Sequence, residues 1–340
     1  MDQRTVAIGF GLALAAGLVL LGLVVSVLVH ELGHVVAGYA AGLRVARVML
    51  GPLEIRDYVS PRVRFAPSLQ AGVVLIPWGR DASVGPLRWG LIISTAAGPL
   101  AGIAFGAIVS GIVSAGRPSV PQSVFEVIGQ CSLILGAVNL LPIREGQVLA
   151  DGRRLFALLA RNRECTEILV ATLMLGEAFS GRRPREWDRA LLDVMERSPS
   201  DPFARLCLYE AALDSGEIEA AGRHLDAALA LRKENWTAAD AILFNEAAYY
   251  AARHRSDARA ARAWLGLAGG WSVVDYLRAR AEAAVLCAEG RTLEGRQRAV
   301  AGLAALSRAR RRDADLSREQ LEELARGAGA MVRPLLTHAR

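Results

Sequence analysis

The chain has 340 residues, of which 53% are hydrophobic, 6% aromatic and 22% charged, so a disordered or collagen-like chain is excluded. The formal net charge is +6, but the basic residues alternate with acidic ones and no nucleic-acid-binding motif accompanies them, so no nucleic-acid partner is expected. The four cysteines are scattered without CxxC spacing, as in proteins of a reducing compartment. Long apolar runs occur only within residues 1–143, which predicts a membrane half followed by a soluble half.

The first predicted element is a transmembrane helix over residues 6–29, which contain no charge. At about 1.5 Å per residue this run is roughly 36 Å long, enough to cross a hydrocarbon core of about 30 Å. A cleaved signal peptide is the alternative. The run is longer than a signal-peptide core and continues directly into His30-Glu31-Leu32-Gly33-His34, so we expect the helix to be retained.

The motif at the end of this helix carries the chemistry. His30 and His34 are four residues apart, so on a helix they project from one face, with Glu31 beside them. Imidazole nitrogens suit zinc, and a neighbouring glutamate can take the proton of a water that attacks a carbonyl. The alternative is a pair of satisfied polar residues in a helix bundle. Ionisable groups next to an uncharged apolar run are costly and usually functional, which favours the metal site.

A loop over residues 44–88 contains three short β-prone runs, at 45–50, 62–65 and 72–76, separated by glycine and proline. These runs predict a small β-sheet at the membrane surface. We expect the run at 72–76 to pair with a substrate by edge addition, and a surface hairpin without a substrate role is the alternative.

Two further apolar segments, at 89–115 and 124–143, predict a second and a third transmembrane helix. In the second, small residues recur every four positions and predict a stripe where another helix can approach closely: Ser94, Gly98, Gly102, Gly106 and Ser110. Arginines are concentrated in the 44–88 loop and after the third span. The positive-inside rule therefore predicts a multi-pass protein of the cell membrane, with its N-terminus outside and its C-terminal domain in the cytoplasm.

A third zinc ligand is expected from an acid near the cytoplasmic end of another span. Glu145 and Asp151 both follow the third span and meet this condition. Gly152 favours Asp151, because glycine permits a tight turn that would direct the carboxylate back to the metal, and Glu145 is the alternative.

The motif HELGH on an early span, followed by Asn-x-x-Pro and Asp-Gly at the end of a later one, resembles the site-2 protease family of intramembrane zinc metalloproteases. The resemblance covers roughly residues 6–155. It implies that Asp151 completes a site for one zinc per chain and that Glu31 is the catalytic base. It also implies that Asn139 and Pro142 shape the substrate-binding part of the site.

This resemblance implies a zinc-dependent endopeptidase that cleaves the transmembrane segment of a single-span, membrane-tethered protein inside the lipid bilayer, as in regulated intramembrane proteolysis. One alternative is a membrane-anchored helical-repeat adaptor with a vestigial zinc site. Another is a zinc protease that cleaves soluble or peripheral peptides. The presence of the ligands together with the base favours the enzyme over the adaptor.

The rest of the chain is predicted to be helical. We expect an intramembrane protease domain at 1–160, a linker with a docking helix at 161–200 and a helical domain at 201–340. The tripeptide Glu-Ala-Ala recurs at positions 210, 246 and 282, each time followed by a polar turn and a second helix rich in Ala and Leu. This spacing predicts a tetratricopeptide-like array able to hold a peptide or a regulator, and a non-repetitive helical bundle is the alternative.

The predicted fold class is therefore a membrane all-α core of about three transmembrane helices with a small membrane-surface β-sheet, joined to a C-terminal α-helical solenoid-like domain.

Overall fold

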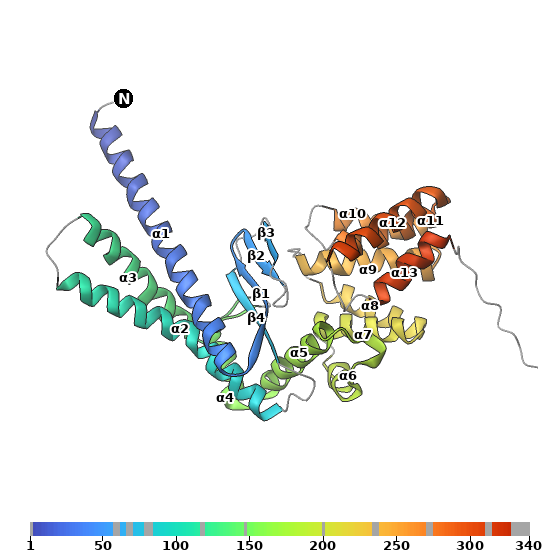
Figure 1. Ribbon diagram of the computed structural model, residues 1–340, viewed down its shortest axis with the longest axis horizontal. Coiled ribbons are helices and arrows are strands. Elements are labelled where there is room, and N and C mark those ends of the chain that lie inside the picture. Colours follow the sequence, from blue (N-terminus) through green and yellow to red (C-terminus); the bar gives the residue numbers. More distant parts are fainter. Residues whose placement is uncertain are drawn as a thin grey trace, which may run out of the picture. The chain divides into compact units, whose positions relative to one another are not determined.

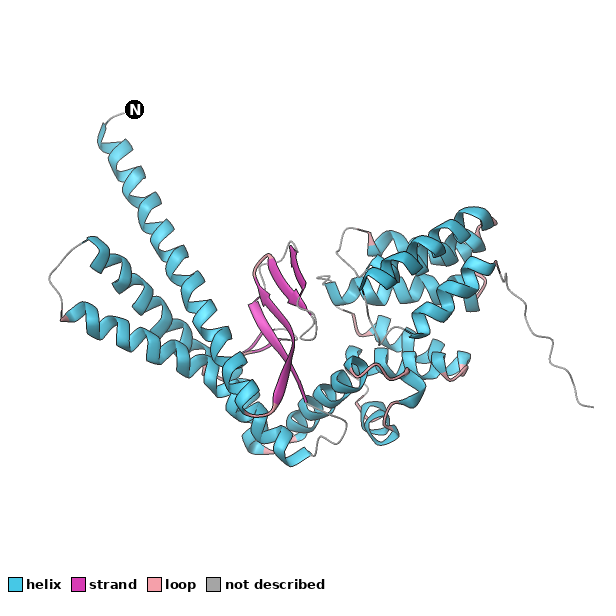
Figure 2. Ribbon diagram, viewed as in Figure 1, coloured by secondary structure: helices cyan, strands magenta, loops and turns pink. Residues whose placement is uncertain are grey.

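The computed structural model describes residues 3–56, 62–65, 71–77, 84–115, 120–145, 148–198, 201–232, 238–269, 275–309 and 315–327. The chain divides into two compact units, Met1–Leu173 and Met174–Arg340. Helices make up most of the described residues, and the described strands all belong to the first unit (Figure 2).

The first unit combines a helical bundle with a small sheet (Figure 1). Its helices are α1 (Gln3–Ala40), α2 (Val84–Ser114), α3 (Val120–Asn139), α4 (Asp151–Ala160) and α5 (Arg163–Phe179), the last of which crosses the boundary between the units. Its strands are β1 (Leu43–Leu50), β2 (Leu53–Arg56), β3 (Arg62–Phe65), β4 (Ala71–Pro77), β5 (Arg144–Glu145) and β6 (Val148–Leu149). Helices α1, α2 and α3 all pack against one another.

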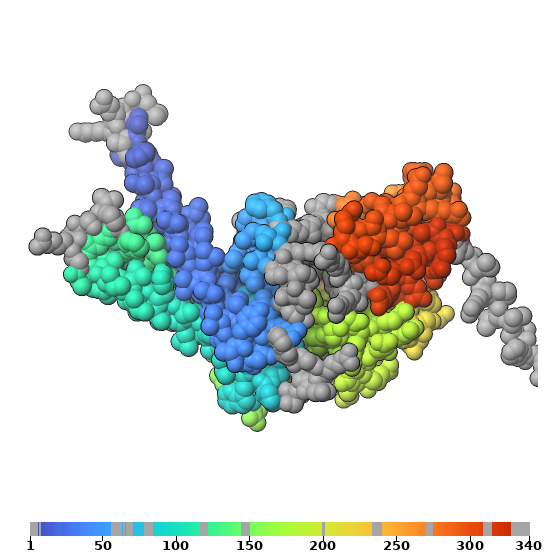
Figure 3. All heavy atoms as spheres, viewed as in Figure 1, coloured from blue at the N-terminus to red at the C-terminus, as the bar shows by residue number. Residues whose placement is uncertain are grey.

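Helix α1 joins the predicted apolar run and the histidine motif in one continuous element of 38 residues. It contains no proline, and no charged residue lies between Arg4 and Glu31. The helix ends just before Gly42, whose φ of 80° is a left-handed conformation that glycine adopts without strain. The N-terminal half of α1 projects free of α2 and α3 and exposes its apolar side chains (Figure 3).

Glycines on α2 allow the three helices to approach closely. A Cβ atom at Gly106 would lie 2.6 Å from the carbonyl oxygen of Gly129 on α3, and one at Gly102 would lie 3.4 Å from the carbonyl oxygen of Ser132. Gly98, from the same row, faces α1 instead. The predicted close approach is therefore confirmed at Gly98 and Gly106, which face two different helices.

Two of the described helical segments are long and apolar enough to cross a membrane, Ile8–Ala40 in α1 and Val84–Ser114 in α2. Helix α3, predicted as the third span, is not one of them. It has only 20 residues and carries an exposed Glu126. Because α3 packs along both α1 and α2, it belongs to the same bundle, and the three-span arrangement remains a prediction.

The main sheet is antiparallel, with the strand order β3-β2-β1-β4. A tight turn at Gly51, with φ of 59°, joins β1 to β2. The predicted run at 72–76 lies within β4, at one edge of the sheet. The sequence pattern missed β2, and it also missed the two-stranded ribbon of β5 and β6 that precedes α4.

The described part of the second unit is helical. After the short helix η1 (Pro184–Glu186) it contains α6 (Arg189–Glu196), α7 (Pro202–Asp214), α8 (Ile218–Ala230), α9 (Ala238–His254), α10 (Ala258–Ala268), α11 (Asp275–Ala288), α12 (Thr292–Ala309) and α13 (Asp315–Arg326). Helices α7 and α8, α9 and α10, and α11 and α12 pack as successive pairs, and α13 packs against α11 and α12.

The three Glu-Ala-Ala tripeptides lie on α7, α9 and α11, the first helix of each pair. They do not occupy equivalent places in those helices. Their glutamates precede the left-handed residue of the following turn by six, ten and eight positions respectively, at Gly216, Ser256 and Gly290. The helical pairs are thus present, but their turns do not follow the 36-residue spacing of the tripeptides. A tetratricopeptide-like array remains a proposal.

A buried ion pair holds the centre of the second unit together. Arg280 is only 2% exposed and donates hydrogen bonds to Glu246 and to Gln320. The Tyr209 hydroxyl donates to the same Glu246 carboxylate at 3.0 Å, and the guanidinium lies 4.6 Å from the centre of the Tyr249 ring. These contacts join α7, α9, α11 and α13, so one neutralised charge pair connects four helices.

Replacing Glu246 with glutamine should destabilise the second unit by about 3–5 kcal/mol, because the buried Arg280 would lose its counter-charge. Denaturant titration of the full chain, followed by hydrogen exchange in α9 and α11, measures this change. Asp226→Asn is the control. It removes an exposed ion pair with Arg255 and should cost about 0–1 kcal/mol. Equal effects of the two variants would contradict the role given to the buried pair.

Candidate metal centre

The metal-binding motif lies in the last three turns of α1. His30 and His34 are one turn apart on the same face of the helix and are 6% and 9% exposed, and Glu31 is 7% exposed. The helix therefore places two imidazoles and a carboxyl group inside the first unit, where polar groups are costly unless they are satisfied.

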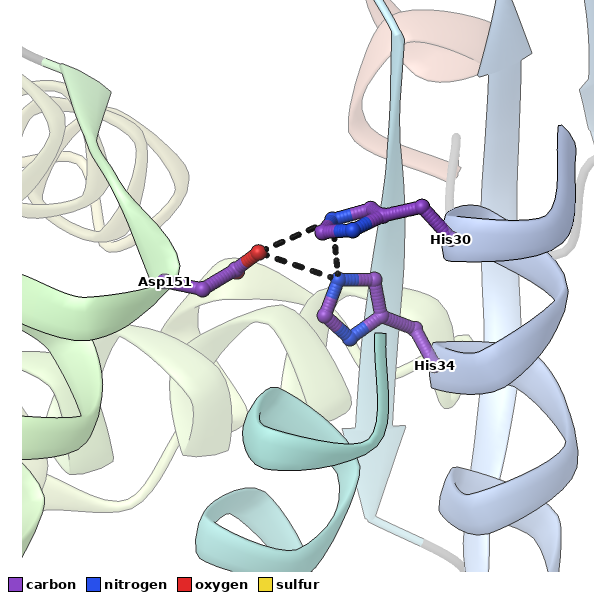
Figure 4. A group of neighbouring side chains, drawn as sticks. All are labelled: His30, His34 and Asp151. Carbon is purple, nitrogen blue, oxygen red and sulfur yellow. Dashed lines mark hydrogen bonds and ion pairs between the residues drawn. The ribbon is translucent and has the colours of Figure 1, made fainter. Parts of the chain in front are cut away.

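Asp151, at the first turn of α4, meets the two histidines (Figure 4). Its Oδ2 atom lies 2.9 Å from Nε2 of His30 and 3.3 Å from Nε2 of His34, and the two Nε2 atoms are 3.1 Å apart. The three donor atoms thus form a nearly equilateral triangle. Among the described residues this is the one group of three or more His, Cys, Asp or Glu side chains that could hold a metal ion.

This triangle fits a tetrahedral zinc ion. Donors at bond lengths of about 2.0–2.1 Å from a tetrahedral zinc are separated by about 3.3 Å. The observed separations of 2.9, 3.1 and 3.3 Å lie close to that value. Two imidazoles and one carboxylate also form a donor set typical of catalytic zinc sites, in which a fourth position stays open.

The charge of Asp151 suits a cation. Burial by itself raises the pKa of this carboxyl group, but its interactions with His30 and His34 outweigh burial and lower the pKa to about 2. Asp151 is therefore ionised at neutral pH and provides the anionic donor of the triangle.

Asp151 reaches the site because the start of α4 lies directly against the end of α3. A Cβ atom at Gly152 would collide with the carbonyl oxygens of Leu140 and Leu141. Gly152 is the second residue of α4 and does not have a left-handed backbone. The predicted reason for this glycine, a tight turn, is therefore wrong. The glycine is needed because any side chain would push Asp151 away from the histidines.

Glu31 places a buried carboxyl group beside His30 in the sequence. Its Oε2 atom is buried and accepts no hydrogen bond from any described residue. A buried carboxylate oxygen without a partner is rarely left so in a structural role, because the loss of hydration is not compensated. This oxygen therefore keeps the capacity to accept a hydrogen bond from a ligand or a water.

The two residues predicted to shape the substrate site do not join the metal cluster. Asn139 is the last residue of α3, and its Nδ2 atom donates to the Leu135 carbonyl oxygen at 3.1 Å. Pro142 follows it in an exposed segment. Glu145, the alternative ligand, lies in β5, and its side chain is outside the described residues.

Sequence reasoning missed how α2 contributes to the site. The Nδ1 atom of His34 lies 2.7 Å from the carbonyl oxygen of Ser94, and Gly98 lies directly against the His34 ring. Both residues were recognised only as members of a helix-packing stripe. A backbone carbonyl leaves no signal in the sequence, so only the structure reveals this contact.

The fold and the site together define a class. A zinc-type donor set with an adjacent buried carboxyl group, at the end of an apolar helix, is the arrangement of a hydrolytic metalloenzyme associated with a membrane. Comparison with known families gives the same result. Residues 18–119 match the model of Peptidase family M50, which confirms the predicted resemblance over this segment.

The matched segment contains α2, the sheet and the part of α1 that bears His30, Glu31 and His34. Asp151 lies beyond it, so its assignment as a ligand depends on the geometry described above. No curated protein and no solved structure matches the chain.

Replacing Asp151 with asparagine should reduce zinc affinity by more than about 100-fold, because it removes the anionic donor itself. Substitutions of residues that only hydrogen-bond to a metal ligand typically cost about 10–100-fold. Glu145→Gln is the matched control and should bind zinc as the wild type does. Zinc content and competition titration of the purified protein measure both. Loss of zinc in Glu145→Gln with retention in Asp151→Asn would assign the third ligand to Glu145.

Proposed function

We propose that this protein is a zinc-dependent intramembrane endopeptidase that binds one zinc ion per chain through His30, His34 and Asp151. The observation that carries the proposal is the triangle of three donor atoms at 2.9–3.3 Å, with a buried carboxyl group beside it on a helix apolar enough to cross a membrane. The match to Peptidase family M50 supports the same reaction.

In this proposal Glu31 moves the proton during peptide-bond hydrolysis. A zinc ion at the site would make water more nucleophilic and polarise the scissile carbonyl. Glu31, through its free Oε2 atom, accepts a proton from the attacking water and delivers it to the leaving amide nitrogen. Its burial keeps bulk water from competing for that carboxylate.

The substrate we propose is a membrane-tethered protein with a single transmembrane segment. Two of the three metal ligands, His30 and His34, lie on a helical segment, Ile8–Ala40, that could itself be within the bilayer, so a transmembrane substrate could reach them without leaving the membrane. Because a helical peptide hides its carbonyl groups in its own hydrogen bonds, the substrate must be locally unwound before attack. Asn139 and Pro142, at the end of α3, would line the region that accepts the unwound segment.

The edge strand β4 is suited to hold such an extended segment. It forms one edge of the sheet, so one side of its backbone faces no other described strand. Leu75 of β4 lies against Gly38 of α1, where an added Cβ would be 2.9 Å from it. Gly38 is one helical turn beyond His34, so β4 passes next to the helix that carries the two histidine ligands. A substrate added as a further strand would be directed toward the metal centre.

The proposal also covers the membrane topology of the protein and the role of its second unit. We infer a multi-pass protein of the cell membrane, with the N-terminus outside and the second unit in the cytoplasm, from the distribution of arginines in the sequence. The helical pairs of the second unit would form a tetratricopeptide-like surface that holds a substrate tail or a regulator. No nucleic-acid partner is proposed.

Glu31→Gln tests the reaction. It should keep zinc and lose cleavage by about 10²–10⁴-fold, because the amide cannot accept the proton. Native membranes with wild-type and variant protein are compared by mass spectrometry for new chain ends inside transmembrane segments. Glu126→Gln, which alters an exposed acid on α3, is the control and should cleave normally. Identical patterns of chain ends for all three proteins, with zinc bound, would favour a membrane-anchored adaptor instead.

Val74→Pro tests strand addition. Proline removes a backbone donor from β4 and should abolish cleavage while zinc stays bound, since the metal ligands lie on other elements. Val63→Pro places the same change in β3, at the opposite edge of the sheet, and should leave cleavage intact. The readouts are zinc content and the chain ends of a substrate identified with Glu31→Gln. Normal cleavage by Val74→Pro would disprove the role of β4.

A further inference from the structure

The two metal-binding histidines are held differently. Nδ1 of His34 lies 2.7 Å from the Ser94 carbonyl oxygen of α2, whereas Nδ1 of His30 is buried and has no hydrogen-bond partner among the described residues. A carbonyl oxygen can only accept, so Nδ1 of His34 must carry the proton of that bond. Nε2 of His34 is then the nitrogen with the free electron pair, and it is the atom that faces Asp151.

The position of the His34 ring also depends on the absence of a side chain at Gly98. A Cβ atom at residue 98 would collide with Nε2 and Cε1 of His34 and would lie 2.8 Å from Cδ2. The space that a side chain would occupy is the space that the imidazole fills. Nε2 is one of the atoms affected, so the conflict would fall on the metal-binding atom itself.

Other glycines of α2 do not have this relation to the site. A Cβ at Gly106 would be as tightly placed, 2.6 Å from the Gly129 carbonyl oxygen, but the conflict would be with α3. A Cβ at Gly102 would meet the Ser132 carbonyl oxygen at 3.4 Å, a distance that a small adjustment relieves. Gly98 therefore differs from Gly102 and Gly106, because it makes room for the His34 ring and not for α3.

We propose that α2 positions the metal ligand His34: the Ser94 carbonyl fixes the ring and its tautomer, and Gly98 leaves the space that the ring occupies. Gly98 and Ser94 are thus positioning residues, since they act through His34. His30 follows from this arrangement, because its ring packs edge-on against the His34 ring with centroids 4.7 Å apart. The inference rests on metal binding at the proposed site and does not depend on proteolysis.

Three glycine variants of the full-length protein in detergent test the proposal, with Co²⁺ as the spectroscopic probe and Zn²⁺ in competition. Gly98→Ala should weaken metal binding by about 10–100-fold and alter the visible absorption of the cobalt complex, as changes next to a ligand commonly do. Gly102→Ala and Gly106→Ala should give the affinity and spectrum of the wild type. Circular dichroism shows whether each variant keeps its helices.

Each outcome is decisive. Wild-type affinity and spectrum in Gly98→Ala would overturn the positioning role, and so would equal losses in Gly98→Ala and Gly106→Ala, because the cause would then be helix packing in general. A wild-type protein that binds neither metal would overturn the proposed zinc site, and this inference with it.

A second measurement needs no variant at the glycines. The chain has only five histidines, so ¹⁵N spectra of the zinc-loaded, imidazole-labelled wild type can be assigned with single histidine substitutions. His34 should show a protonated Nδ1 and a metal-bound Nε2. Zinc bound through Nδ1 of His34 would overturn the proposal even if Gly98→Ala failed to fold.

Discussion

The burial of two imidazoles and the Glu31 carboxyl group inside an apolar helical unit, with Asp151 half-buried beside them, is the constraint on which the rest of the structure depends. Polar groups lose hydration there, and each must find a partner or a function. The first unit meets this requirement with a backbone contact as well as with side chains. The Ser94 carbonyl oxygen accepts a hydrogen bond from Nδ1 of His34, and the start of α4 brings the Asp151 carboxylate to the ring nitrogens.

Such backbone contacts require that helices approach more closely than ordinary side chains allow. At three places a glycine makes this possible: Gly98 beside the His34 ring, Gly152 beside the end of α3, and Gly33, where a Cβ would lie 2.6 Å from the Ala97 carbonyl oxygen. Gly33 lies within the histidine motif on α1, Gly98 lies on α2 and Gly152 lies on α4. The candidate metal centre is thus built from three segments that only small residues allow to meet.

The sequence predicts the local part of this site and not the assembled part. Helical periodicity alone puts His30 and His34 on one face, and the apolar run before them predicts the helix that carries them. The ribbon of β5 and β6 was missed because two-residue strands are too short for an alternating pattern. The role of Gly152 was misjudged because a glycine that allows a turn and one that allows close approach look alike in a sequence. The tripeptide spacing in the second unit indicated helical pairs but not the different lengths of their first helices.

The two units show what separates a structural buried charge from a functional one. In the second unit Arg280 has Glu246 as a counter-ion, and Tyr209 and Gln320 add hydrogen bonds to the pair. Such a network is neutral overall and offers nothing to a ligand. In the first unit the carboxylate oxygen of Glu31 and a ring nitrogen of His30 are buried without partners among the described residues, next to a triangle of donors. Buried polar atoms without partners also occur in the second unit, for example Oδ1 of Asn245. Among the described residues, however, the side chains that could share a metal ion cluster in the first unit. The unused hydrogen-bonding capacity of Glu31 and His30 is therefore better explained by a ligand at this site than by the packing of the helices.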